Sequence, residues 1–283
     1  MKVLVTGVNG QLGHDVMIHL QRQGIDAVGV DIQDFDLTDE NAVMSYVQHA
    51  KPTAIIHCAA YTAVDKAESD IAKCCQINGE GTRNMVRAAV SVKAKLLYVS
   101  TDYVFPGEGT EPYETDDPKG PRNIYGQSKL QGEVAVTSQM TAYFIVRTSW
   151  VYGVNGNNFV KTMLRLGAER DSINVVCDQI GSPTYSYDLA RCLVDLIRTS
   201  NYGVYHATNE GFCSWAEFAA EIFSLARLPV RVRPISTAEY PTKARRPLNS
   251  RLDKSGLERA HFSRLPHWKD ALKRFLAASG QTL

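Results

Sequence analysis

The sequence predicts an α/β fold, a Rossmann-type doubly wound parallel sheet with a smaller C-terminal substrate-binding lobe. Two observations carry this prediction. Short apolar runs alternate with amphipathic stretches through the first half of the chain, and the first run leads directly into a glycine-containing turn. Because these runs are apolar on both faces, we expect parallel strands covered by helices on both sides and joined by right-handed crossovers.

The first half of the chain supplies the elements of this sheet. Apolar runs predict strands at 2–7, 26–31, 53–60, 95–102 and 142–150. Amphipathic patterns predict helices from the glycine-containing turn to Leu20 and at 38–50, 70–92 and 123–140. Thr38 is the expected N-cap of the second helix. We assign residues 1–150 to the Rossmann-type domain.

The alternation of apolar and amphipathic stretches is less regular after Trp150. It predicts helices at 157–169, 186–199, 215 onward and 266–278, strands at 173–178 and 203–208, and a loop rich in proline and arginine at 238–253. We expect residues 151–283 to form mainly the smaller lobe, and leave open that later segments return to the first domain.

Composition excludes several classes of protein. The chain has 283 residues, 44% of them hydrophobic, and a net charge of +1, so no general attraction to nucleic acid or an anionic membrane is expected. No apolar run approaches the roughly 18 residues that cross a membrane. Strand-like sequence from Lys2 leaves no room for a signal peptide, so we expect a cytoplasmic protein. Six cysteines without a C-x-x-C pair and seven histidines without ligand spacing predict free thiols and no metal.

The turn after the first strand has the spacing of a phosphate-binding loop. Gly7, Gly10 and Gly13 form G-x-x-G-x-x-G between a predicted strand and a predicted helix. Glycines let the backbone approach a pyrophosphate, and the N–H groups at the helix N-terminus bind its negative charge. This placement in a strand–helix series predicts dinucleotide binding.

The ends of the next two strands predict further coenzyme contacts. Asp31 ends the second strand. A carboxylate at this place accepts hydrogen bonds from ribose hydroxyls and repels a 2′-phosphate, so it favours NAD(H) over NADP(H). Asp36 and Leu37 lie where the adenine edge is expected. The small Ala59 and Ala60 permit close approach to the middle of the coenzyme.

Tyr125 and Lys129 stand four residues apart on the helix predicted at 123–140 and therefore share one face. A phenol with a pKa near 10 is a poor acid–base catalyst at pH 7, and a neighbouring ammonium group lowers that pKa. Thr101 adds a further hydroxyl at the end of the fourth strand. Together with the glycine-containing turn, the pair indicates an acid–base group near a bound dinucleotide.

The glycine-containing turn, Thr101 at the end of the fourth strand and the Tyr125/Lys129 pair together resemble the motifs of the extended short-chain dehydrogenase/reductase superfamily. Within it, blocks such as "STDYVFPG", "NIYGQSKLQGE", "VRTSWVYG" and "RRPLNSRLD" look like the dTDP-4-dehydrorhamnose reductases over nearly the whole chain. The resemblance implies reduction of the C4 keto group of dTDP-4-dehydro-L-rhamnose by NADH or NADPH. It further implies coenzyme contacts by Gly10, Gln11, Leu12, Asp31, Asp36, Leu37, Ala60, Tyr61 and Thr62, and contacts to the sugar nucleotide by Thr101, Asp102 and Trp150.

A sugar-nucleotide substrate is negatively charged, so its binding site in the second lobe should contain basic residues. The loop "TKARRPLNSR" offers Arg246 among four basic residues, and arginine suits bidentate binding of pyrophosphate. Asn158 and Lys161 open the helix predicted at 157–169, whose N-terminus can also bind phosphate. We therefore predict Asn158, Lys161 and Arg246 as substrate-binding residues.

Alternatives remain on the sequence alone. A dehydratase of this superfamily usually has Asp–Glu after the threonine, whereas Thr101 is followed by Asp102 and Tyr103. An epimerase needs the same tyrosine and lysine, and a non-catalytic regulatory protein of the same fold is less consistent with their presence.

Relatives have been described as Mg²⁺-bridged dimers. Asp15 and Asp188 lie in the corresponding regions without an adjacent acidic pair, so we interpret them as helix-surface or cap acids. Mg²⁺ is considered but not predicted, and monomer and homodimer both stay open.

Overall fold

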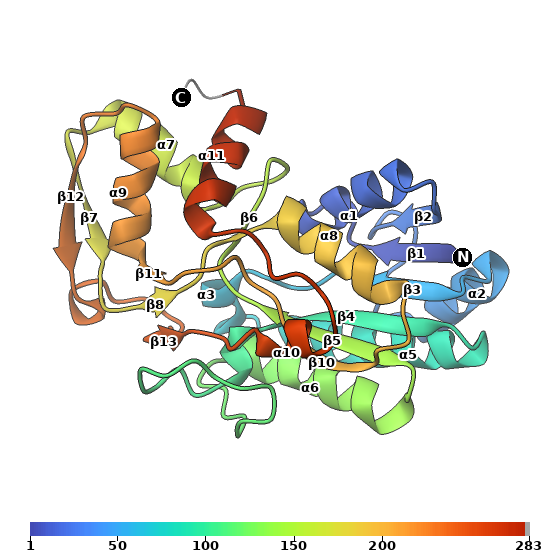
Figure 1. Ribbon diagram of the computed structural model, residues 1–283. Helices are drawn as coiled ribbons and strands as arrows, with labels where there is room; N and C mark the ends of the chain where they lie inside the picture. Colours follow the sequence, from blue (N-terminus) through green and yellow to red (C-terminus); the bar gives the residue numbers. More distant parts are fainter. Residues whose placement is uncertain (281–283) are drawn as a thin grey trace.

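A six-stranded parallel sheet forms the centre of the larger lobe. The computed structural model describes residues 1–280, and its sheet has the strand order β10-β5-β4-β3-β1-β2 (Figure 1). The strands are β1 (Lys2–Thr6), β2 (Asp26–Val30), β3 (Ala54–His57), β4 (Lys95–Thr101), β5 (Tyr143–Thr148) and β10 (Gly203–His206). The predicted α/β doubly wound fold is confirmed.

Helices cover both faces of this sheet. Helices α1 (Gln11–Arg22) and α8 (Ser186–Ile197) pack on one face, and α2 (Glu40–Ala50), α5 (Gly81–Ser91) and α6 (Ile124–Gln139) lie on the other. Side chains alternate between the two cores because successive strand residues point to opposite faces: Val3 and Val5 belong to one core and Leu4 to the other. The strands are therefore apolar on both sides, as a buried parallel sheet requires.

The sheet has a switch point between β1 and β3. Strand β2 lies on one side of β1 and β3 on the other, so the chain leaves the carboxyl ends of β1 and β3 in opposite directions. Ligands of open parallel sheets bind at such a point. Gly7 directly follows β1 and Cys58 directly follows β3.

The second lobe has its own core beside the sheet (Figure 1). Aromatic side chains including Tyr152, Phe218, Trp268 and Phe275 fill this core. Its elements are β6 (Val151–Tyr152), α7 (Phe159–Glu169), β7 (Ser172–Val176), β8 (Ile180–Gly181), β9 (Thr184–Tyr185), β11 (Cys213–Ser214), α9 (Trp215–Leu225), β12 (Arg231–Ile235), η3 (Thr237–Glu239), β13 (Asn249–Ser250) and α11 (Trp268–Ala278). The segments α8, β10 and α10 (Ser255–Arg259), which also follow residue 150, lie in the larger lobe, where β10 pairs with β5 and Leu257 of α10 joins the core.

Several local predictions differ from the structure. The helix predicted at 70–92 is divided into α4 (Ile71–Cys75), a π-helical turn η1 (Gln76–Glu80) and α5, after a short α3 (Val64–Ala67). Asp39, not Thr38, caps α2, because its carboxylate accepts from Ala42 N at 3.0 Å while the Thr38 hydroxyl donates to Asp36. The loop predicted at 238–253 contains β13, which pairs with β8.

A buried ion pair joins α6 to β5. Arg147 donates to both carboxylate oxygens of Glu133, at 2.8 and 2.7 Å, and both side chains are almost fully buried. Ser100 on β4 donates to the same carboxylate at 2.6 Å, and Arg147 also donates to the Thr115 carbonyl at 2.8 Å. Every polar group of Glu133 is thus paired, which compensates for removing its charge from water.

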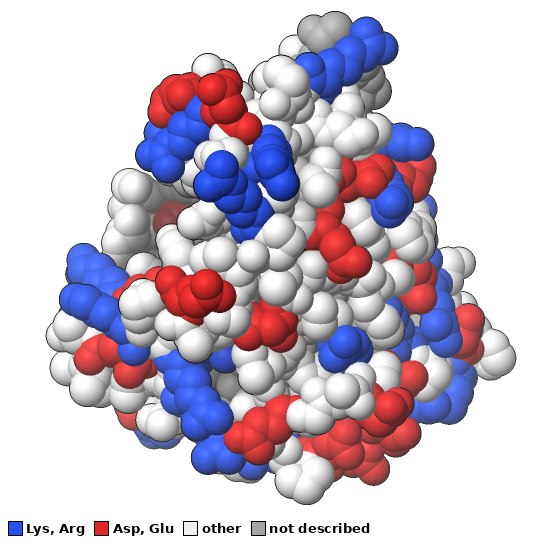
Figure 2. All heavy atoms as spheres, turned by 90° about the vertical axis from the view of Figure 1, so that its left-hand side faces the viewer, with Lys and Arg blue, Asp and Glu red and all other residues white. Residues whose placement is uncertain are grey.

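Charges of both signs are mixed over the face that Figure 2 shows, in keeping with the net charge of +1. Within residues 1–280, no helix combines the length and the apolar character needed to cross a membrane.

Replacing Arg147 with methionine should lower the free energy of unfolding by about 3–5 kcal/mol, because it leaves the Glu133 carboxylate buried without its cation. Urea unfolding measures the change. Arg165→Met is the matched control, since Arg165 and Glu169 form an exposed i, i+4 pair whose loss should cost less than about 1 kcal/mol. Equal costs for the two substitutions would contradict this account of the α6–β5 contact.

Candidate active site

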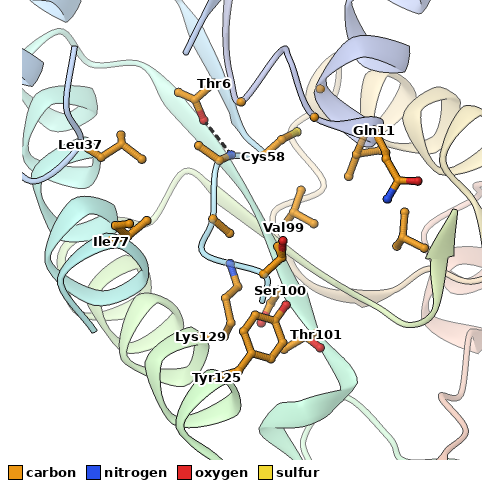
Figure 3. Close-up of a pocket in the computed structure, with 18 of the residues that line it drawn as sticks. Thr6, Gln11, Leu37, Cys58, Ile77, Val99, Ser100, Thr101, Tyr125 and Lys129 are labelled. Carbon is orange, nitrogen blue, oxygen red and sulfur yellow. Dashed lines mark hydrogen bonds between the residues drawn. The ribbon is translucent and has the colours of Figure 1, made fainter. Parts of the chain in front are cut away.

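A cavity of about 1050 Å³ opens at the carboxyl ends of β1, β3 and β4 (Figure 3). It lies at the switch point of the sheet and extends toward the start of the second lobe. Most of the predicted site residues line it: Gly7, Gly10, Gln11, Leu12, Gly13, Asp31, Asp36, Leu37, Ala60, Thr62, Thr101, Asp102, Tyr125, Lys129 and Trp150.

The glycine-containing turn fits a bound pyrophosphate. Gly7 has a φ of +73°, and a β-carbon there would lie 2.8 Å from the backbone of Ala59, so a side chain would close the approach between β1 and β3. Gly10 caps α1 with no side-chain hydrogen bond, and the first turn of α1 contains no acidic residue. The N–H groups of this helix end are thus available to an anion.

A buried threonine and histidine hold the ends of β1 and β3 together. Thr6 accepts a hydrogen bond from Ala59 N at 3.1 Å and shares a second hydrogen bond, of 2.7 Å, with His57 Nδ1. Burial, together with the charge of Lys129, lowers the pKa of His57 to about 3, so the ring is neutral. Its Nε2 shares a hydrogen bond of 3.3 Å with the Thr82 hydroxyl. Sequence reasoning missed both residues, since neither belongs to a motif.

The acids at the end of β2 are tied to the backbone around them. The Asp31 carboxylate accepts from Asn9 N, within the glycine-containing turn, at 2.9 Å. Asp36 accepts from the backbone and the hydroxyl of Thr38, both at 2.8 Å. The cavity wall at β2 therefore presents a fixed carboxylate beside the phosphate-binding turn.

Tyr125 and Lys129 project from α6 into the cavity, next to Thr101 at the end of β4 (Figure 3). Lys129 is only 3% exposed, and its ammonium nitrogen lies 4.0 Å from the centre of the Tyr98 ring. Burial lowers the pKa of Lys129 to about 7, and the charge of Glu133 opposes that shift. The three residues predicted as catalytic are therefore brought together.

The predicted effect of Lys129 on Tyr125 is wrong in this structure. The pKa of Tyr125 is raised above its ordinary value, first by burial and then by the negative charge of Asp102, while the neighbouring Thr101 hydroxyl opposes the shift. Burial favours the neutral phenol over the charged phenolate. Tyr125 thus keeps its proton at neutral pH, as a proton donor must.

Close packing fixes α6 at this position. Asn123 caps the helix by accepting from Gly126 N at 2.8 Å. A side chain at Gly126 would collide with the carbonyl of Tyr103, and one at Gly132 with the Tyr98 hydroxyl. The helix therefore approaches β4 and its continuation η2 (Asp102–Val104) closely enough to place Tyr125 beside Thr101.

Asn78 connects α6 to the loop after β3. Its amide oxygen accepts from Tyr61 N at 2.8 Å, and its amide nitrogen donates to the Tyr61 carbonyl at 3.1 Å and to Ser128 at 2.9 Å. Ser128 in turn donates to the Tyr125 carbonyl at 2.7 Å. Asn78 stands in the π-helical turn η1, so the break in the predicted helix has a role at the site. No sequence signal indicated it.

Trp150 lies at the boundary of the two lobes in a left-handed conformation, with a φ of +51°. Its ring stacks on Trp215 with 3.7 Å between ring centres, and Gly181 leaves room for it. A non-glycine residue in this conformation is held by its surroundings and is typical of functional sites. Asp102, also a predicted contact to the sugar nucleotide, is 3% exposed and accepts a hydrogen bond from Ser250 of β13 at 2.5 Å.

Four predicted residues are not among those that line the cavity: Tyr61, Asn158, Lys161 and Arg246. Asn158 caps α7 and donates to Gln11, and Lys161 donates to the carbonyls of Val154 and Gly156. Arg246 pairs with Asp65 at 2.6 Å and reaches the hydroxyl of Tyr103, which does line the cavity.

The two acids considered for a metal bridge are not surface residues, contrary to the sequence interpretation. Asp15 is buried and accepts from Ser186, and Asp188 is buried in a two-fold ion pair with Arg274, at 2.7 and 2.6 Å. Within residues 1–280, no group of three or more His, Cys, Asp or Glu side chains is placed to hold a metal ion.

Comparison with known proteins gives consistent matches along the whole chain. The family described as "RmlD substrate binding domain" matches residues 1–280. A dTDP-4-dehydrorhamnose reductase of Streptomyces griseus is 44% identical, over 95% of this chain and 91% of the relative.

Two solved structures share the fold closely. A dTDP-4-dehydrorhamnose reductase of Clostridium acetobutylicum is 44% identical with a TM-score of 0.96, and one of Bacillus anthracis in complex with NADP is 48% identical with a TM-score of 0.95. Each alignment covers 98% of this chain and 99% of the other. The chain belongs to the RmlD substrate binding domain family.

Proposed function

We propose that this chain reduces the C4 keto group of dTDP-4-dehydro-L-rhamnose with NADPH or NADH, giving dTDP-L-rhamnose. The observation that carries the proposal is the meeting of Thr101, Tyr125 and Lys129 in the cavity that the glycine-containing turn also lines. Relatives at 38–48% identity with the same activity in their names support the choice of substrate.

The residues of this chain suit a reduction. The bound coenzyme supplies the hydride. Tyr125 holds its proton at neutral pH and donates it to the keto oxygen as negative charge develops there. Lys129 places a cation beside this oxygen and the coenzyme ribose, and Thr101 offers its hydroxyl to orient the substrate carbonyl.

The second lobe contributes to substrate binding in this proposal. Trp150 offers an aromatic face to the sugar, and Asp102 lies next to Thr101 at the same end of the cavity. Arg246 contacts Tyr103 at the cavity wall and is the cation we propose for the substrate pyrophosphate. Binding there requires the phosphate to compete with Asp65 for the guanidinium group.

The proposal is tested by following NAD(P)H oxidation with dTDP-4-dehydro-L-rhamnose generated in place. Tyr125→Phe should lower kcat by at least about a hundredfold, because the proton donor is lost, and should leave coenzyme binding nearly unchanged. Tyr202→Phe, at an exposed position, is the control. Absence of oxidation with either coenzyme would reject the proposed reaction, and turnover without net oxidation would indicate an epimerase.

Gly7→Ala should weaken NADH binding by at least about tenfold, because its β-carbon would lie 2.8 Å from the backbone of Ala59. Gly24→Ala is the matched control: Gly24 also has a positive φ, of +63°, but nothing lies within 4 Å of the added carbon. Both variants carry the same kind of backbone strain, so only the close approach distinguishes them. Fluorescence titration measures both affinities, and equal losses would show that the approach is not needed.

Asp31→Asn should raise the ratio of kcat/KM for NADPH to kcat/KM for NADH by about tenfold, because it removes a carboxylate that repels a 2′-phosphate. The amide still accepts the hydrogen bond from Asn9 N. Asp26→Asn, at the opposite and exposed end of β2, is the control and should leave the ratio unchanged. An unaltered ratio in Asp31→Asn would remove Asp31 from coenzyme selection.

A further inference from the structure

The glycine-containing turn is in contact with a segment of the second lobe. Residues 153–158 connect β6 to α7, and we call them the strap. The half-buried Asn155 lies within it, and its amide nitrogen donates to the carbonyl oxygens of Asn9 and Gly10, at 2.8 and 3.3 Å. One side chain of the second lobe thus binds two consecutive carbonyl groups of the turn.

The strap also binds the next residue of the turn. Gln11 Oε1 accepts from Gly153 N at 2.8 Å and from the Asn158 amide at 2.9 Å. Two glycines of the strap allow this close approach, since a β-carbon at Gly153 or Gly156 would lie 3.3 or 3.2 Å from the Gln11 side chain. Three consecutive residues of the turn therefore each present an acceptor to a donor of the strap.

The larger lobe holds the same turn from its other side. Asn9 N donates to the Asp31 carboxylate at 2.9 Å, and Gly7 N donates to the Val30 carbonyl at 2.9 Å. Asn9 is thus held through its N–H group by one lobe and through its carbonyl group by the other. The conformation of the turn depends on both lobes, although all of its residues belong to the first.

Glycine makes an alternative conformation of this turn accessible. The peptide group between Asn9 and Gly10 can rotate at little cost, because Gly10 tolerates φ values of either sign. Rotation would direct the Asn9 carbonyl oxygen away from Asn155 and toward the cavity that Asn9, Gly10 and Gln11 line. A carbonyl oxygen there would repel a pyrophosphate, whereas the N–H groups of the first turn of α1 attract it. The Asn155 amide stabilises the conformation that suits an anion.

We propose that Asn155 is a positioning residue for coenzyme binding, through which the second lobe keeps the glycine-containing turn in the conformation that accepts a pyrophosphate. Asn155 acts through the backbone of Asn9 and Gly10, which line the cavity, while Asn155 itself is not among the lining residues. This inference rests on the proposed function, in which the turn binds the pyrophosphate of the coenzyme.

Asn155→Ala should raise the Kd for NADH by about five- to tenfold, because a smaller fraction of the protein then has the turn in the binding conformation. Fluorescence titration measures this Kd. Asn201→Ala is the matched control: the Asn201 amide also donates to a backbone carbonyl, that of Ala260 at 3.2 Å, and Asn201 does not line the cavity. Equal Kd values in the two variants would overturn the proposal.

Asn155→Asp provides a second variant of the same size. Its carboxylate cannot donate, faces two carbonyl oxygens and adds a negative charge near the pyrophosphate. The Kd for NADH should therefore rise by about thirtyfold or more, and the excess over Asn155→Ala should shrink as salt is added, because salt screens the added charge. A variant Asn155→Asp that binds NADH as tightly as the wild type would also overturn the proposal.

The affinity for dTDP separates positioning of the turn from a general loosening of the second lobe. Calorimetric titration without coenzyme should give the same Kd for dTDP in Asn155→Ala and in the wild type, and urea should unfold both at the same concentration. Equal losses of affinity for NADH and dTDP would show a merely structural role and overturn the proposal. A wild type that does not bind dTDP would contradict the proposed substrate, and the NADH titrations would still decide the role of Asn155.

Discussion

The close approach of α6 to β4 is the constraint on which the rest of the site depends. Gly126 and Gly132 leave no side chain between the helix and the Tyr103 carbonyl or the Tyr98 hydroxyl. The Glu133–Arg147 pair then fixes the helix to β5 from inside the core. A shift of one residue along α6 would turn Tyr125 by about 100° around the helix, away from Thr101. Packing therefore determines where the proton donor stands before any ligand arrives.

The second lobe completes the site through contacts that are distant in sequence. Gln11, on the first turn of α1, accepts hydrogen bonds from Gly153 N at 2.8 Å and from the Asn158 amide at 2.9 Å. Ser250 reaches Asp102 across a separation of 148 residues. The coenzyme end and the proton-donating end of the cavity are thus each tied to the lobe that we propose to bind the sugar nucleotide. Such ties couple substrate binding to the geometry of the reacting groups.

Local sequence patterns predicted the features that depend on residues close together in the chain, namely the strands, the helices and the binding motifs. The strand–helix alternation predicted the parallel sheet. The motif spacings pointed to Gly7, Thr101, Tyr125 and Lys129, and all four line one cavity in the structure. What the sequence could not indicate depends on long-range contacts. Asn78 forms hydrogen bonds to two segments from a π-helical turn. Lys161 on α7 donates to carbonyls of the loop that precedes this helix and does not line the cavity. Burial also reversed the expected pKa shift of Tyr125, and burial is a property of the folded chain.

The central claim is that Tyr125, Lys129 and Thr101 serve the transfer of a hydride to C4 of a nucleotide-linked keto sugar. Reduced coenzyme carrying deuterium at both C4 positions of the nicotinamide tests it most directly, with the product analysed by NMR. We expect one deuterium at C4 of the deoxysugar for each coenzyme oxidised, and almost none with Tyr125→Phe in the same time. Product without deuterium at C4, or with deuterium at another carbon, would contradict it.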